Sequence, residues 1–292
     1  MKLLTVVAAT SQQGQSIIQA VLSDPQLRTE YTIRGTTRSP DSVLAQNLIQ
    51  KYNSKNGGCL ELVTADVTDP SSLKHAFTGA AVVFATSITV YDGHTYSHEV
   101  SHGHALADAA VAAGVPEAYI RSLEPVIKSA FVAPGSFMSN FGDLMAPRPV
   151  HGLHGDGVYA LATPVRAETR LPLIDTRADF GKWVAAVLAD LDGYEGKTLC
   201  CATGLYSFAE IVEVMDRVSG KKVVYRQVPE EVWKGFLPEL MRDHIADMLR
   251  YFQEFGYYGD GTKEKVELGA AQARGRLTTL EEYLEAHPLR LK

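Results

Sequence analysis

The sequence has few cysteines and no long apolar run. Its three cysteines, Cys59, Cys200 and Cys201, are odd in number, and two are adjacent, where a disulfide would be strained. We therefore expect reduced thiols, as in an intracellular protein. No stretch approaches 18 unbroken apolar residues, and the chain passes from Lys2 straight into a strand-like run without a signal-peptide pattern. These absences predict a cytoplasmic protein without a membrane anchor, with the nucleus as a second compartment if it is a regulator.

The chain also lacks an excess of positive charge. Its formal net charge is -6, which predicts no attraction to the phosphates of nucleic acids. Hydrophobic residues make up 46% and charged residues 21% of the 292 residues, as in an ordinary globular enzyme. This length suits one large α/β domain, or a nucleotide-binding domain with a smaller substrate lobe.

Two glycines are missing from the strand, turn and helix expected over residues 2–21. A dinucleotide-binding loop carries three glycines, whereas this loop has Ala8, Ser11 and Gly14 at the same spacing. Gly14 preserves the position that allows close packing of helix on strand, while Ser11 puts a side chain where the backbone would meet phosphate. The Ser11 hydroxyl could instead bond a phosphate oxygen, and the helix N-terminus favours an anion. The loop either binds a dinucleotide or is a structural remnant of one that did.

The first half of the chain alternates short β-branched runs with helix-like segments. This pattern predicts an α/β fold with a Rossmann-type doubly wound parallel sheet. We expect strands over residues 3–8, 29–36, 60–64 and 81–85, and helices over 14–22, 40–52, 70–77 and 97–113. Asp69 followed by Pro70 is typical of a helix start.

The alternation breaks after Ala113. Residues 115–123 favour a second helix with no strand before it, so we predict that a segment carrying a strand and a loop is missing between Val115 and Pro116. A Cα separation there far above about 3.8 Å would instead indicate unresolved residues. The next expected strand covers residues 128–134.

The second half is less regular and predicts a smaller α+β lobe. We expect strands over residues 158–162, 173–175, 198–201 and 222–227, and helices over 177–190, 207–219, 229–255 and 278–286. The last helix opens with Thr-x-x-Glu capping chemistry. We therefore divide the chain into an NADP(H)-binding domain, residues 1–141, and a substrate or partner lobe, residues 142–292, some of whose strands could return to the main sheet.

The second expected strand ends in Thr36-Thr37-Arg38-Ser39, with no acidic residue to accept a bond from a ribose 2'-hydroxyl. An arginine at this place can pair with a 2'-phosphate, which favours NADP(H) over NAD(H). The alternative is a solvated surface arginine.

Residues 98–102 match H-E-x-x-H, the zinc-protease helix motif. No third ligand follows at a recognised spacing, so we predict no metal site, with adventitious nickel or zinc binding as the alternative. The Tyr-x-x-x-Lys dyad of short-chain reductases is absent from the whole chain. Candidate hydroxyl groups for catalysis are Ser87 and Tyr91, with Tyr96 nearby, because they follow the fourth expected strand, where ligands of open α/β sheets bind.

Together these features resemble the NmrA-like family, atypical members of the short-chain dehydrogenase/reductase superfamily. The resemblance rests on the order and spacing of VVAATSQQG at 6–14, TTRSP at 36–40, ADVTDPSSL at 65–73, EAYIRSL at 117–123, APGSFMSNF at 133–141, LPLIDTRADFGKWVAAVL at 171–188 and LTTLEEYLEAH at 277–287. The chain departs from the family at Ala8 and Ser11, and we expect it to lack the family's fifth strand and the loop that carries its active-site lysine.

The resemblance implies roles for residues of the cofactor site. Arg38 would meet the 2'-phosphate, and the other positions follow in chain order. The pyrophosphate would lie against Ala8, Thr10, Ser11, Gln12, Gln13 and Gly14, the adenine by Asp66 and Val67, the ribose by Thr86 and Ser87, and the nicotinamide beside Phe137, Met138, Ser139 and Asn140.

The same resemblance implies three classes of function. The family contains reductases, some in fungal secondary metabolism, and non-catalytic NADP(H) sensors that bind transcription factors. The altered loop allows a third class, a Rossmann-derived protein that has lost its cofactor and performs non-redox chemistry. We expect the first: an NADP(H)-dependent oxidoreductase that transfers hydride between nicotinamide and a small organic carbonyl or enone. An apolar pocket of substrate size beside Phe137 and Tyr91 would favour the enzyme, and a shallow cleft with a large exposed apolar patch would favour a regulator with a protein partner.

Overall fold

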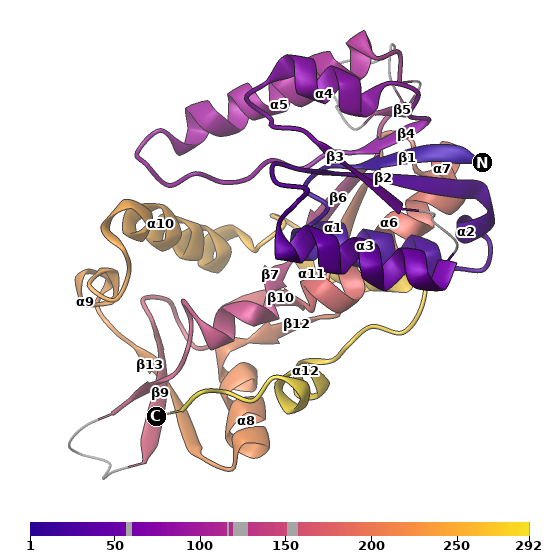
Figure 1. Cartoon of the computed structure of the whole chain (residues 1–292). Helices are drawn as coiled ribbons and strands as arrows, with labels where there is room; N and C mark the ends of the chain where they lie inside the picture. Colours follow the sequence, from indigo (N-terminus) through magenta and orange to yellow (C-terminus); the bar gives the residue numbers. More distant parts are fainter. Residues whose placement is uncertain (57–59, 116, 119–127, 151–156, 292) are drawn as a thin grey trace. The chain divides into compact units, whose positions relative to one another are not determined.

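The structure is a computed structural model that describes residues 1–56, 60–115, 117–118, 128–150 and 157–291 (Figure 1). The chain forms two compact units. The first comprises residues 1–132 and 180–199, and the second comprises residues 133–179 and 200–292. The expected functional division at residue 141 stays a prediction.

A parallel five-stranded sheet with the order β3-β2-β1-β4-β5 forms the centre of the first unit. Its strands are β1 (Lys2–Val6), β2 (Tyr31–Thr37), β3 (Leu60–Thr64), β4 (Val82–Phe84) and β5 (Glu117–Ala118). β1 pairs with both β2 and β4, so the strand order reverses beside β1. This is the Rossmann-type doubly wound arrangement, which confirms the predicted fold class.

Helices cover both faces of this sheet (Figure 1). α4 (Pro70–Phe77) and α5 (Thr95–Ala112) lie on one face, and α1 (Gln12–Ser23) and α3 (Val43–Asn56) lie on the other. The short helices α2 (Leu27–Glu30) and α7 (Leu191–Tyr194) and most of α6 (Thr176–Ala189) also belong to this unit. The predicted start of α4 is confirmed, because the Asp69 carboxylate accepts from the backbone N–H groups of Ser71 and Ser72 and Pro70 follows it.

β5 corrects two expectations about the region after Ala113. Residues 117 and 118 pair in parallel with Val82 and Val83 of β4, so the predicted helix is wrong at these positions and the fifth place in the sheet is filled. The physical reason is that the edge of β4 offers unpaired backbone groups, and pairing with them outweighs local helix propensity. Pro116, at the predicted break, and residues 119–123 of the predicted helix lie outside the described residues.

The second unit contains two small mixed sheets, as expected of an α+β lobe. Their orders are β12-β10-β7 and β13-β9-β8. Their strands are β7 (Ser136–Phe137), β8 (Arg148–Pro149), β9 (Val158–Thr163), β10 (Arg170–Ile174), β12 (Gly204–Ser207) and β13 (Lys222–Gln227). β6 (Phe131–Pro134) pairs with β11 (Thr198–Cys201), and the division between the two units falls within both strands. Within the described ranges, every strand of the five-stranded sheet comes from residues 2–118, so none returns to it from the second half.

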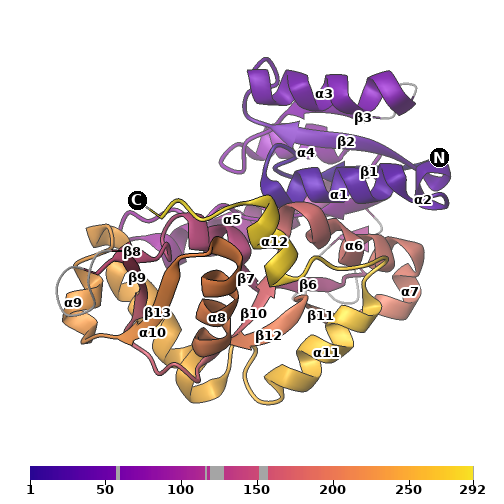
Figure 2. The same cartoon turned by 90° about the horizontal axis from the view of Figure 1, so that it is seen from below.

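Within the described residues, the α-helices that lie wholly in the second unit are α8 (Phe208–Ser219), α9 (Glu230–Lys234), α10 (Glu239–Phe255), α11 (Thr262–Gln272) and α12 (Leu280–Ala286). α8 and α12 lie side by side (Figure 2). The capping chemistry predicted for α12 is confirmed, with Thr279 and Glu282 bonding each other's backbone N–H groups. The sequence did not predict α11, in which only Val266 and Gly269 are buried, because so narrow an apolar face gives little periodicity.

Cys200 and Cys201 are buried, and burial raises the pKa of both thiols. Cys59 lies outside the described residues. No helix within the described ranges combines the length and the apolar character that a membrane span requires.

A close approach between α1 and α6 predicts a strong effect of one methyl group on stability. The Gly181 N–H donates to Ser16 Oγ at 2.8 Å, and a Cβ at Gly181 would lie 2.1 Å from Ser16 O. We expect Gly181→Ala to lower the free energy of unfolding by about 1–3 kcal/mol, measured by denaturant titration. Gly103→Ala is the control: Gly103 is an exposed position in α5 with nothing near its Cβ site, and the substitution should raise stability by about 0.5–1 kcal/mol. Equal effects at the two positions would contradict the close approach.

Candidate functional site

A cleft of about 620 Å³ opens at the carboxyl ends of the parallel strands in the first unit. We call it the strand-end cleft. It is lined by Val7, Ala8, Thr10, Ser11, Thr36, Thr37, Arg38, Ser39, Ser42, Ala65, Asp66, Val67, Thr68, Leu73, Thr86, Ile88, Val90, His98 and His102. These residues come from the segments that follow β1, β2, β3 and β4 and from α4 and α5. Open α/β sheets bind ligands at this place, beside the point where the strand order reverses.

The loop after β1 is held in an unusual backbone conformation at Ala8. Its φ is 53°, in the left-handed region that favours glycine, and it stands where a dinucleotide loop has its first glycine. Hydrogen bonds to Thr36 at the end of β2 hold it there, because Ala8 N donates to Thr36 Oγ1 at 3.2 Å and Ala9 N donates to Thr36 O at 2.9 Å. The loop therefore keeps the glycine conformation although the glycine is gone.

Ser11 and Gly14 form the first turn of α1. Ser11 is the N-cap, and its Oγ accepts from Gly14 N at 3.1 Å. A Cβ at Gly14 would lie 2.4 Å from Ala8 O, so only glycine allows this helix to approach the end of β1 so closely. The N–H groups of Gln12 and Gln13 have no acceptor within the helix and remain suited to an anion.

The ends of β2 and β3 supply the charged groups of the strand-end cleft. Arg38 is exposed, and its positive charge contributes to lowering the pKa of Asp66. The larger causes are hydrogen bonds from the Thr68 backbone N–H and hydroxyl to Asp66 Oδ1, at 2.9 and 2.8 Å. Asp66 is thus held as a carboxylate, an acceptor for ligand hydroxyl or amino groups.

The residues expected to bind cofactor divide into three sets. The structure brings Ala8, Thr10, Ser11, Arg38, Asp66, Val67 and Thr86 together in the lining of the strand-end cleft. Gln12, Gln13 and Gly14, in the first turn of α1, and the exposed Ser87 lie outside that lining. Phe137 in β7 and Met138, Ser139 and Asn140 in the following 3-10 helix belong to the second unit, where Met138 is fully buried.

The hydroxyl groups expected to take part in catalysis lie on the segment after β4 and in α5. Tyr91 is half-buried and Tyr96 is 82% exposed, and neither is in the cleft lining that the structure describes.

Two histidines in the cleft lining were not predicted to bind a ligand. His98 and His102 lie on α5 with ring centroids 6.0 Å apart, and His98 Nε2 lies 2.9 Å from Asp92 Oδ2. No three His, Cys, Asp or Glu side chains among the described residues are arranged to hold a metal ion. In the sequence these histidines stand out through the H-E-x-x-H match, which is a metal-binding motif. The four-residue spacing of His102 and Leu106, which share the buried face of α5, is the signal that could have indicated the burial of His102.

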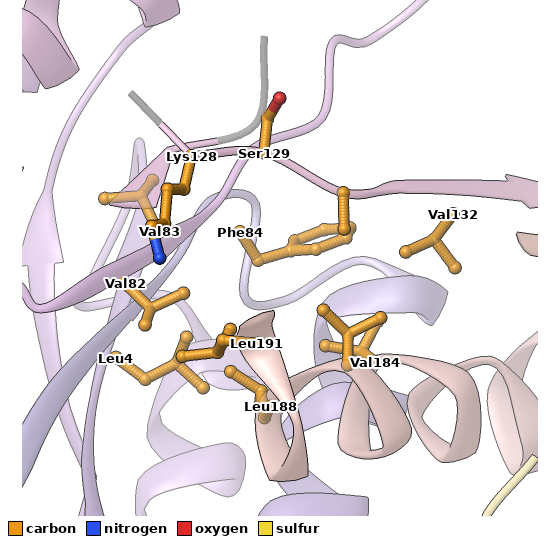
Figure 3. A pocket seen from close by; sticks show the side chains of 12 residues that line it. Leu4, Val82, Val83, Phe84, Lys128, Ser129, Val132, Val184, Leu188 and Leu191 are labelled. Carbon is orange, nitrogen blue, oxygen red and sulfur yellow. The ribbon is translucent and has the colours of Figure 1, made fainter. Parts of the chain in front are cut away.

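A second cavity in the same unit is too small for an organic substrate. It measures about 60 Å³ and is lined by Phe84 and by aliphatic side chains of β1, β4, α6 and α7, together with Lys128, Ser129, Ala130 and Val132 (Figure 3). This volume holds only a few water molecules. The strand-end cleft is therefore the candidate site of this unit.

The strained conformation of Ala8 predicts a stabilising substitution. We expect Ala8→Gly to raise the free energy of unfolding by about 0.5–1 kcal/mol, because relief of the left-handed strain exceeds the entropy that glycine adds to the unfolded chain. Ala9→Gly is the control; Ala9 is fully buried without a positive φ, and its substitution should destabilise by about 1 kcal/mol. Thermal and denaturant unfolding would measure both, and a loss of stability in Ala8→Gly would show that the loop is not strained there.

Comparisons with known proteins converge on one family. The family model described as the NmrA-like family matches residues 1–120 and 117–284, in two segments that meet where the alternation of strands and helices breaks. The NmrA-like family domain-containing oxidoreductase cpsB of Aspergillus campestris is 26% identical over 305 aligned positions, which cover 88% of this chain and 85% of that protein.

Solved structures share the fold over nearly the whole chain. NmrA, a negative transcriptional regulator solved in complex with NADP, has a TM-score of 0.73 at 19% identity, covering 98% of this chain and 95% of its own. The same regulator has also been solved with NAD. The triphenylmethane reductase of Citrobacter sp., complexed with NADP(H), has a TM-score of 0.70 at 21% identity, covering 97% of this chain and 99% of its own.

Proposed function

The chain belongs to the NmrA-like family, and on this premise we propose that it is an NAD(P)-dependent oxidoreductase that prefers NADP(H) and acts on a small organic carbonyl or enone. Relatives support the redox assignment, since the Aspergillus protein is named an oxidoreductase and the Citrobacter protein is a reductase complexed with NADP(H). An assignment to secondary metabolism is part of the proposal and follows from the family's fungal reductases.

The observation that carries the proposal is the fit of the strand-end cleft to a dinucleotide. Gly14 permits the close helix–strand approach that a pyrophosphate loop requires, and a Cβ there would fill it. Ala8 keeps the backbone conformation of the missing first glycine. Ser11 replaces the second glycine but directs its Oγ to Gly14 N, which leaves its hydroxyl proton available for a phosphate oxygen. The volume of about 620 Å³ lies within the range of cofactor sites.

The preference for NADP(H) rests on the end of β2. Arg38 lines the cleft, and no acidic residue stands between Thr36 and Ser39 to accept from a ribose 2'-hydroxyl. A guanidinium can pair bidentately with a 2'-phosphate, which NADP(H) has and NAD(H) lacks.

The protein's part in the reaction would be binding, orientation and stabilisation of charge. A bound nicotinamide supplies the hydride. The loop of residues 8–14 and Arg38 would hold the phosphates, while Asp66 and Thr86 would accept and donate bonds to the remaining polar groups. In this proposal a hydroxyl from Ser87 or Tyr91 donates to the oxyanion that develops on the substrate, and the nicotinamide contact expected of Phe137 to Asn140 stays a prediction.

A second candidate function is a non-catalytic regulator that binds dinucleotide and a protein partner. The observation that favours it is the absence of the Tyr-x-x-x-Lys dyad from this chain, together with the likeness to a negative transcriptional regulator. Oxidation of NADPH by the purified protein, in the presence of carbonyl or enone compounds, would favour the enzyme. A third candidate, a fold that has lost its cofactor, would bind neither dinucleotide.

The Arg38 contact predicts a selective loss of affinity. Calorimetric titration of the purified protein should show tighter binding of NADPH than of NADH. Arg38→Ala should weaken NADPH binding by about tenfold or more, because a hydrogen bond to a charged group is lost, and should change NADH binding less than about threefold.

Arg28→Ala serves as the control, because Arg28 is an exposed arginine of α2 outside the cleft lining. It should leave both affinities unchanged. Equal weakening of NADPH and NADH by Arg38→Ala would refute the 2'-phosphate contact. Absence of binding of either dinucleotide at millimolar concentration would overturn both the enzyme and the regulator.

A further inference from the structure

His102 occupies the only polar position on the buried face of α5. The buried residues of this helix are His102, Leu106, Ala107, Ala109 and Ala110. Leu106, Ala109 and Ala110 pack into the apolar cluster that α4, α5 and the sheet share, and His102 lies one turn before them, where the face reaches the strand-end cleft. Only 7% of His102 is exposed.

The two ring nitrogens of His102 have different surroundings. Nδ1 is completely buried and has no hydrogen-bond partner among the described residues. Nε2 has no partner there either, yet it is not one of the completely buried atoms, so it is accessible. Because the side chain lines the strand-end cleft, the cleft is where Nε2 is exposed.

This difference determines which nitrogen carries the proton. A proton on Nδ1 would leave a buried N–H donor without an acceptor, which is more costly than a buried lone pair without a donor. The tautomer with its proton on Nε2 is therefore favoured. In this tautomer His102 offers the cleft a hydrogen-bond donor from the buried face of α5.

The surroundings of His102 indicate what this donor meets. The segments after β3 and β4 and helix α4 contribute the aliphatic side chains of Val67, Leu73, Ile88 and Val90, together with the polar side chains of Asp66, Thr68 and Thr86. The guanidinium of Arg38 and the N-terminus of α1 come from the segments after β2 and β1. This side of the cleft therefore suits a flat group with apolar faces and polar atoms on its edge, including an acceptor for His102, which is the chemistry of a purine base.

We propose that His102 recognises the purine base of the nucleotide, with Nε2–H donating to a ring nitrogen of the base. The assignment rests on the proposed function, because it requires that the cleft take a nucleotide. In this proposal His102, the second histidine of the H-E-x-x-H match, contributes to ligand specificity rather than to metal binding.

The test measures the affinities of four proteins for NADPH, for ADP and for the 1-deaza, 3-deaza and 7-deaza analogues of ADP. The proteins are the wild type, His102→Leu, His102→Gln and His104→Leu. Leucine removes the donor and keeps an apolar shape, and glutamine can place an amide N–H near Nε2. His104→Leu is the control, because His104 is an exposed histidine of α5 outside the cleft lining.

The expected result is a loss specific to one ring nitrogen. His102→Leu should weaken NADPH and ADP binding about tenfold, and His102→Gln should restore the affinity to within about threefold of wild type. One deaza analogue should bind the wild type about tenfold more weakly than ADP but bind His102→Leu as well as ADP does. His104→Leu should leave the discrimination among analogues unchanged.

A stability measurement separates this role from a structural one. His102→Leu removes an unpartnered buried nitrogen, so its midpoint of thermal unfolding should equal or exceed that of the wild type while nucleotide affinity falls. If His102→Leu binds NADPH as the wild type does, or if no analogue distinguishes the two proteins, this inference is wrong and the proposed function stands. If the wild type binds no nucleotide at all, the proposed function is wrong and the inference falls with it.

Discussion

The close contact between the first turn of α1 and the end of β1 is the constraint on which the candidate site depends. A Cβ at Gly14 would lie 2.4 Å from Ala8 O, so the helix can begin directly behind the strand only because this residue is glycine. That contact directs the helix N-terminus, with its unpaired N–H groups, toward the strand-end cleft. The remaining cleft residues add charge and shape to a place that this contact defines.

The two lost glycines have different consequences in this setting. At Ala8 the backbone retains a φ of 53°, so alanine strains the loop without changing its conformation. At Ser11 the cost is a side chain in the cleft lining, which is partly offset because its oxygen caps α1. An altered fingerprint is thus compatible with the same backbone arrangement, and under the proposed function what it would change is the strength with which an anion is held.

The sequence predicted those parts of the fold that local patterns determine. β1 to β4 follow from β-branched runs, and the starts of α4 and α12 follow from Asp69 and Thr279, whose side chains cap the backbone beside them. β5 was not predicted because two residues carry no periodicity and their pairing depends on the distant edge of β4. Of the 19 residues that line the cleft, seven were expected to bind cofactor. Four of them, in the loop after β1 and at the end of β2, follow from the spacing of the loop and the charge after the strand, and Asp66, Val67 and Thr86 follow from the family resemblance. His102 was not expected, because its proposed role rests on the burial of one ring nitrogen and the exposure of the other, which spacing along the chain does not reveal.

The central claim is that the strand-end cleft binds a dinucleotide despite its altered loop. Hydrogen–deuterium exchange with and without saturating NADPH tests it most directly, because protection is located along the chain. The account predicts slower exchange in residues 8–14, 36–42, 65–68 and 86–102, with little change in α8 and α12. Unchanged exchange in all four segments, or protection confined to other parts of the first unit, would contradict it.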